Sequence, residues 1–204
     1  MSKRLWLSAG LSSLTKPFAI GLRRLAGPYA RRLRSRTARP GDRSHLDEVY
    51  LSINGKLRYL WRAVDQDGEV LDILVQPRRN ERAAKKFFRK LLRRLQYVPR
   101  AIVTDKLGGY AAAKAEALPS VLHIQGKRAN NRAENSHQPT RERERRMRGF
   151  KSPAHAQRFL ATFGVIASFF RPGRHLLAAR NYREVMRRRF TEWNEVIHPS
   201  FAGE

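Results

Sequence analysis

The sequence contains no cysteine, which excludes disulfide bonds, zinc sites built on thiolates and cysteine nucleophiles. It also has no uninterrupted apolar run long enough to span a bilayer, so no membrane association is expected. Acidic residues are scarce, because 17 Asp and Glu stand against 43 Lys and Arg, a formal net charge of +26. An excess of this size predicts a polyanionic partner, and nucleic acid is the usual one.

Charge alone leaves the class of protein open. A ribosomal or architectural protein coats nucleic acid without acting on it, and neutralising phosphates gives affinity in either case. The chain has 204 residues, of which 41% are hydrophobic and 9% aromatic. These values predict one or two folded domains with a buried core.

The N-terminal residues 1–45 are expected to form a basic arm. Its only acid is Asp42, and Pro40-Gly41 lies near its end. Its first 25 residues are rich in Arg, Ser and Leu and resemble a transit peptide. Decayed or misread coding sequence gives the same composition, so both interpretations stay open.

Three consecutive strands follow the arm. Alternating apolar residues and turn signals predict antiparallel strands at 46–53, 57–64 and 69–76. Asn54-Gly55 is a strong hairpin signal, because both residues accept the positive φ of a type I′ turn.

The rest of the chain alternates helices with short strands. An apolar stripe after a possible N-cap at Asn80 predicts a helix ending near Leu95. The later predictions are strands at 101–105 and 120–125, a helix at 109–117, basic helical sequence from about 129, and helices at 153–170 and 178–195. The order predicts an α/β fold, a mixed sheet covered by helices.

Two acids occupy strand positions where a charge is costly. Asp47 shares the apolar face of the first strand, and Asp105 ends a buried strand, where ligands of α/β sheets gather. Glu134 is the leading third candidate. Three carboxylates brought together would repel one another unless cations lay between them, and Mg²⁺ suits such oxygen ligands. Structural roles remain the alternative: a buried structural acid at Asp47, an N-cap at Asp105 and a solvated helix surface at Glu134.

The strings HLDEVY (45–50), YLWRAVDQDGEVLD (59–72), IVTDKLGGY (102–110), NNRAENSHQPTRERERRMRGFKS (130–152) and AQRFL (156–160) resemble insertion-sequence transposases of the DDE superfamily. The similarity extends over about residues 27–195 and is strongest to the insertion sequence family six group. This resemblance implies an RNase H-like, retroviral integrase-like fold with a mixed five-stranded sheet flanked by helices. It also implies a catalytic and metal-binding triad of Asp47, Asp105 and Glu134.

The resemblance further implies two Mg²⁺ ions, replaceable by Mn²⁺, for cleavage and strand transfer at transposon ends. The partners would be DNA, as transposon ends and target, and further copies of the chain in a homo-oligomer. The compartment would be the bacterial cytoplasm, at the nucleoid. Ten residues are predicted to contact DNA: Lys106, Lys127, Arg128, Asn130, Asn131, Arg132, Arg141, Arg143, Arg145 and Arg146. His137 follows Glu134 by about one helical turn and is expected to be a hydrogen-bonding neighbour of the site rather than a ligand.

The expected domains are the arm at 1–45, a catalytic domain at 46–175 and a C-terminal helix and tail at 176–204. Family members usually carry a helix-turn-helix before the catalytic domain, and residues 1–20 are too few for one with a linker. An N-terminally truncated transposase is therefore expected. Two alternatives remain: a DNA-binding remnant without activity, and a nuclease that cuts without joining.

Overall fold

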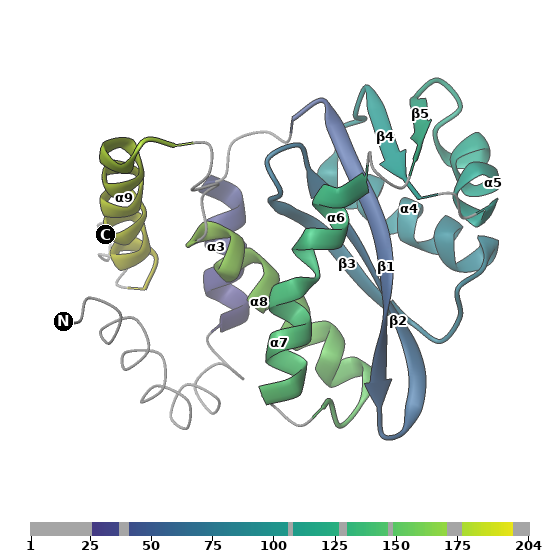
Figure 1. Ribbon diagram of the computed structural model, residues 1–204, viewed down its shortest axis with the longest axis horizontal. Helices are drawn as coiled ribbons and strands as arrows, with labels where there is room; N and C mark the ends of the chain where they lie inside the picture. Colours follow the sequence, from purple (N-terminus) through teal and green to yellow (C-terminus); the bar gives the residue numbers. More distant parts are fainter. Residues whose placement is uncertain are drawn as a thin grey trace, which may run out of the picture.

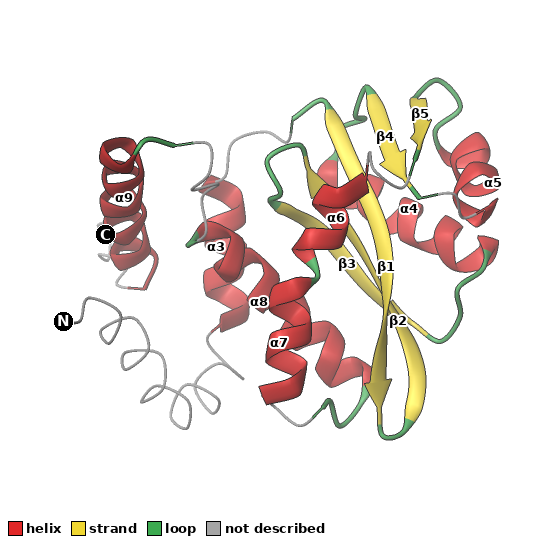
Figure 2. Cartoon of the chain, in the orientation of Figure 1, coloured by secondary structure: helices red, strands yellow, loops and turns green. Residues whose placement is uncertain are grey.

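The structure is a computed structural model that describes residues 26–36, 41–105, 108–126, 130–146, 149–170 and 177–197. Within these ranges the structure does not describe the side chains of Ala26, Ser35, Arg36, Arg132 and Glu134. A five-stranded sheet in the order β3-β2-β1-β4-β5 forms the centre, with helices on both faces (Figures 1 and 2). This confirms the mixed five-stranded sheet flanked by helices, the RNase H-like arrangement that the resemblance implies.

The first three strands form an antiparallel meander. They are β1 (Arg43–Ile53), β2 (Lys56–Asp65) and β3 (Val70–Gln76). Asn54 and Gly55 have φ values of 50° and 68°, which confirms the predicted hairpin. The strand β1 begins three residues before the predicted start, because Arg43 to Leu46 pair with a later parallel strand as well as with β2.

Two short parallel strands extend the sheet on the other side of β1. They are β4 (Ala101–Thr104) and β5 (Leu122–Gln125), separated by helix α5 (Gly108–Ala117). Helix α4 (Glu81–Leu95) precedes them and is capped as predicted, since Asn80 Oδ1 accepts the Ala83 N–H at 3.0 Å. Helices α4 and α5 cover one face of the sheet, where Trp61, Phe87 and Tyr110 lie in a single apolar cluster.

The opposite face is covered by α6 (Asn131–Ser136), α7 (Gln138–Arg146) and α8 (Pro153–Phe169). The predicted basic helix is thus two short helices that meet at His137. Helix α8 buries Ala156 and Leu160 against the apolar side chains of β1, including Val49 and Leu51. The alternation of β1 therefore sorts its residues between two apolar clusters, one on each face of the sheet.

Part of the predicted arm belongs to the folded body. Helix α3 (Ala26–Arg36) buries Ala30 and Leu33 against α8 and the C-terminal helix α9 (Ala179–Ile197). The structure places both terminal helices beside α8, and the division into an arm at 1–45, a catalytic domain at 46–175 and a C-terminal helix and tail at 176–204 stays a prediction. The N-terminal residues 1–25 lie outside the described part. Among the described residues, no helix combines the length and the apolar character needed to cross a membrane.

Candidate active site

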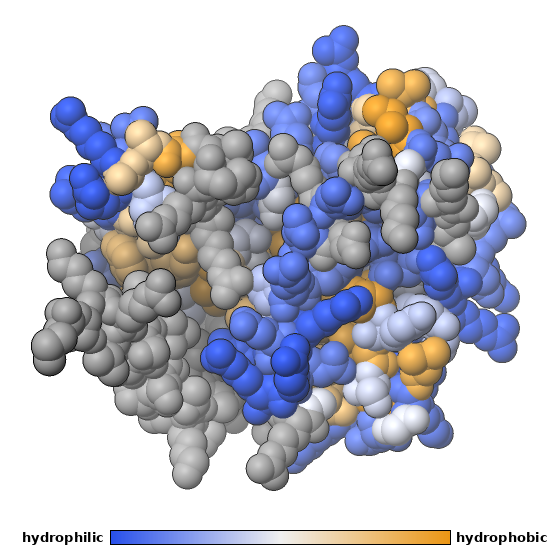
Figure 3. Space-filling model, in the orientation of Figure 1, coloured by the Kyte–Doolittle hydropathy of each residue, from blue (hydrophilic) through white to orange (hydrophobic). Residues whose placement is uncertain are grey.

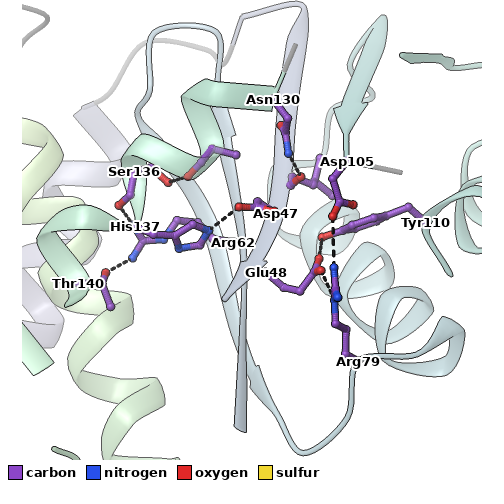
Figure 4. Close-up of polar contacts among 12 residues, drawn as sticks. Asp47, Glu48, Arg62, Arg79, Asp105, Tyr110, Asn130, Ser136, His137 and Thr140 are labelled. Carbon is purple, nitrogen blue, oxygen red and sulfur yellow. Dashed lines mark hydrogen bonds and ion pairs between the residues drawn. The ribbon is translucent and has the colours of Figure 1, made fainter. Parts of the chain in front are cut away.

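The parallel pairing of β1 with β4 brings the first two predicted acids together. In this register Leu46 is the partner of Thr104, where β4 ends, so the next residue of each segment, Asp47 and Asp105, lie side by side. One carboxylate oxygen from each of Asp47, Glu48 and Asp105 lies within 4.8 Å of the other two. The site therefore forms where a short strand ends beside a longer central one (Figure 4).

Asp47 is in an environment that disfavours its charge. Its side chain is 17% exposed, and burial together with the nearby charge of Asp105 raises the pKa of Asp47 from 3.8 to about 6. His137 Nε2 lies 3.3 Å from Asp47 Oδ2, a contact that is an ion pair when the imidazole is protonated. His137 thus contacts the first acid, and it does so from the junction of α6 and α7.

Glu48 is held on the other face of β1. Tyr110 donates its hydroxyl to Glu48 Oε2 at 2.6 Å, and Arg79 donates Nε–H to Glu48 Oε1 at 2.5 Å. Burial raises the pKa of Glu48, and these two hydrogen bonds oppose the rise. Both carboxylate oxygens have donors, so Glu48 serves mainly to fix Arg79 and Tyr110.

Arg79 connects this hydrogen-bond network to the second acid. Its Nη2 donates to Asp105 Oδ2 at 3.2 Å while its Nε is bound to Glu48. Figure 4 shows the guanidinium between the two carboxylates, on the side away from His137. Asp105 is therefore oriented by Arg79, and the charges of Arg79 and Arg141 also lower the pKa of the facing Asp47, against the larger effect of burial.

Helix α6 is anchored to β1 at both ends. Before the helix, Asn130 Nδ2 donates to the backbone carbonyl of Leu46 at 2.8 Å, and after it His137 contacts Asp47. Glu134 lies in the backbone span between these two contacts, beside the aspartates. Its side chain is outside the described residues, so its place in the triad stays a prediction.

A buried arginine of β2 also holds the junction between α6 and α7. Arg62 is 2% exposed and lies directly across from Asp47 in the β1–β2 register. It donates to the backbone carbonyl of Ser136 and to the hydroxyl of Thr140, and burial lowers its pKa to about 10. Arg62 therefore links the end of α6 and the start of α7 to the strand beside the acids.

The residues predicted to contact DNA are in several different environments. Asn131, Arg141, Arg145 and Arg146 are exposed on α6 and α7. Arg143 is half-buried, with its guanidinium 5.2 Å from the centre of the Phe163 ring. Asn130 is buried, and its bond to Leu46 favours a structural role over DNA contact. Lys106, Lys127, Arg128 and the Arg132 side chain lie outside the described residues.

Sequence reasoning missed four residues of the site. Glu48 was adjacent to a predicted acid, but strand alternation alone put it on the opposite face. Arg79 precedes α4, and Tyr110 lies within α5. Nothing in the local sequence of either residue indicates a contact with β1. Arg62 lies in a predicted strand, and its burial depends on helices distant in sequence.

The chain is similar to several known proteins. Residues 41–172 match the family model of a DDE domain of the IS240 type. The transposase for insertion sequence-like element IS431mec of Staphylococcus aureus is 30% identical over 106 residues, 50% of this chain and 47% of that protein. An uncharacterized protein of Yersinia pseudotuberculosis, pYV0051, is 37% identical over 70 residues, 33% of this chain and 65% of that protein. The catalytic core domain of BIV integrase has a TM-score of 0.47 at 18% identity, covering 60% of this chain and 82% of that one.

The sheet and its pair of aspartates define an RNase H-like domain with an acidic centre, and the match over most of the chain makes it a DDE domain. The chain belongs to the DDE transposase family. Within that family it is of the insertion sequence family six type, with the Staphylococcus aureus transposases among its relatives. It spans about half the length of those relatives.

Proposed function

We propose that the protein cleaves DNA strands and joins them to a target in transposition, with Asp47 and Asp105 as its metal-binding residues. The observation that supports this most is the pair of facing carboxylates, in which Asp105 helps raise the pKa of Asp47 to about 6. Two carboxylates that face one another at this separation repel each other, and carboxylate oxygens are the ligands that Mg²⁺ prefers. The donor set therefore fits a divalent metal.

Mg²⁺, or Mn²⁺ in its place, would be held by Asp47 and Asp105, with Glu134 as the third carboxylate from α6. Two such ions would activate the attacking hydroxyl and stabilise the leaving oxygen of a phosphodiester. The protein's own contribution is orientation. Arg79 fixes Asp105, while His137 and Asn130 hold α6 against β1 on either side of Glu134.

DNA is proposed to reach the acids along α7. The exposed arginines there, Arg141 and Arg145, line a surface hollow together with Glu142. Contacts of this kind neutralise phosphates and position the strand without reading its sequence. Asn131, Arg146, Lys106, Lys127, Arg128 and Arg132 complete the proposed DNA-contacting set. The substrates would be transposon ends and target DNA, handled by a homo-oligomer.

The test is cleavage and joining of labelled DNA oligonucleotides with Mg²⁺ or Mn²⁺. Wild type should give cut and joined products only with metal, and Asp105→Ala should give none. Asp67→Ala, which removes an exposed acid from the β2–β3 turn, is the matched control and should retain activity.

The outcomes separate the remaining alternatives. Tight binding without any cleavage by the wild type would identify a DNA-binding remnant. Cleavage that never yields joined strands, even with a free 3′-hydroxyl end supplied, would identify a nuclease. Equal loss of activity in Asp67→Ala would remove the assignment to the aspartate pair.

A further inference from the structure

Helix α9 is oriented by one apolar face. Trp193 packs edge-on against Tyr29 and Phe170, with ring centroids 6.2 and 5.5 Å apart, and Val196 is buried beside α3. Arg189 on the same side donates Nη1–H to the Ser168 carbonyl at 3.1 Å. These contacts fix which side of α9 faces outward.

The outward side presents three arginines, Arg180, Arg183 and Arg187, at spacings of three and four residues. All three are exposed, and together with Glu184 they line a surface hollow. In Figure 3, hydrophilic side chains lie at the upper left, beside hydrophobic ones, at the end of the molecule where Figure 1 places α9. Within the described part of the chain, none of the three is paired with an acid.

Helix α4, which is also basic, differs in this respect. On α4, Lys90 and Arg94 are paired with Asp72, and Lys85 and Arg89 are paired with Glu116. The protein therefore neutralises much of the basic charge of α4 internally. The charge on the outer side of α9 is left for an external anion.

We propose that the outer face of α9, formed by Arg180, Arg183 and Arg187, binds the phosphates of a DNA strand away from the active site. This inference rests on the proposed function for the identity of the polyanion. It adds a contact surface at the opposite end of the molecule from β4 and β5 (Figure 1). A DNA molecule bound there is held independently of the scissile phosphate.

The spacing of the arginines agrees with such a strand. Seven residues of helix separate Arg180 from Arg187, which at 1.5 Å per residue is about 10 Å. Phosphates of one strand of B-DNA recur every 3.4 Å along the axis, so this span corresponds to about three phosphate steps, enough for each arginine to meet a different phosphate. The contact would neutralise charge without reading sequence.

The experiment measures binding of a fluorescein-labelled 30-base-pair duplex in EDTA as a function of salt. Each phosphate contact contributes about −0.9 to the slope of log K against log salt. Replacing all three arginines by glutamine should make the slope shallower by about 2.7, so the ratio of wild-type to variant affinity changes about 40-fold between 50 and 200 mM salt. The Arg→Lys triple variant retains the charges and should keep the wild-type slope.

The matched control removes three exposed basic residues from α4, as Arg82→Gln, Lys86→Gln and Arg93→Gln, with the same loss of net charge. The slope of log K against log salt for this control should differ from the wild-type slope by no more than about one. An unchanged slope in the α9 variant, or equal changes in both variants, overturns the proposal. A change in oligomeric state without a change in slope overturns it in favour of a protein partner. Failure of the wild type itself to bind would instead contradict the proposed function.

Discussion

Two aspartates of the sheet, the partly buried Asp47 and the buried Asp72, are in opposite electrostatic environments. At the sheet centre, Asp47 faces Asp105, a second acid, and the pKa of Asp47 rises to about 6. At the interface between β3 and α4, the β3 residue Asp72 is 1% exposed, and Lys90 and Arg94 of α4 both bind its carboxylate. One acid is left with an incomplete set of counter-charges, and the other is fully compensated.

The difference indicates which acid is structural. Burying a charge is costly unless it is paired, and Asp72 meets this requirement within the protein. Asp47 is compensated only in part, because burial and the charge of Asp105 raise its pKa more than Arg79 and Arg141 lower it. Burial alone therefore does not identify a functional acid.

The largest expected effect is on chemistry. Asp47→Asn should lower cleavage by at least about 10³-fold, because a bound metal contributes several kcal/mol to the transition state. Asp72→Asn should leave the rate per folded molecule within about threefold of wild type. Single-turnover cleavage of a labelled oligonucleotide measures both, and similar losses in the two variants would end the distinction.

The pH dependence of stability should follow Asp47 when metal is absent. Its folded-state pKa of about 6 lies above its ordinary value of 3.8, so the folded state binds the proton more tightly. The contribution of the Asp47 proton to the free energy of unfolding is fully present below about pH 4. As pH rises through 6 it is lost, and the free energy of unfolding falls by about 3 kcal/mol.

Other buried acids shift the wild-type curve in the same direction, so the quantity to measure is the difference between wild type and Asp47→Asn. Urea unfolding in EDTA from pH 4 to 7 gives that difference. A gap between the two proteins that stays constant over this range would show that Asp47 has an ordinary pKa.

Replacing Asp72 should lower the stability of the folded protein. Asp72→Asn leaves Lys90 and Arg94 without their counter-charge, and both are about one third exposed, so the cost should be about 2 kcal/mol, less than for fully buried cations. Thermal or urea unfolding measures it. Asp67→Asn in the exposed β2–β3 turn is the matched control, and a stability loss no larger than in that control contradicts the compensation of Asp72.

The smallest expected effect is at Tyr110. Tyr110→Phe removes the hydroxyl that donates to Glu48 at 2.6 Å and should cost about 1 kcal/mol in unfolding free energy. The pKa of Glu48 should rise further, since that hydrogen bond opposes the effect of burial. NMR titration of the Glu48 carboxyl measures the shift, and an unchanged pKa would show that Arg79 alone holds Glu48.

Much of the framework was predictable because its signals are local. Alternation, together with Asn54-Gly55, predicted the β1–β2 hairpin, and the apolar stripe after Asn80 predicted α4 to the residue at its end. The pairing of Asp47 with Asp105 followed from the motifs of a family, not from their spacing. Helix α3 was not predicted, because its burial depends on contacts with α8 and α9 over more than a hundred residues of sequence.

The sequence by itself determined the strand and helix periods, the excess of positive charge and the positions of the candidate acids. Those properties belong to single residues and their near neighbours. The tertiary structure alone decided which charges are compensated. Asp72 meets Lys90 and Arg94 across a sheet–helix interface, while Asp47 meets Asp105 across two parallel strands. Electrostatic energy depends on distance in space, and only the fold sets that distance.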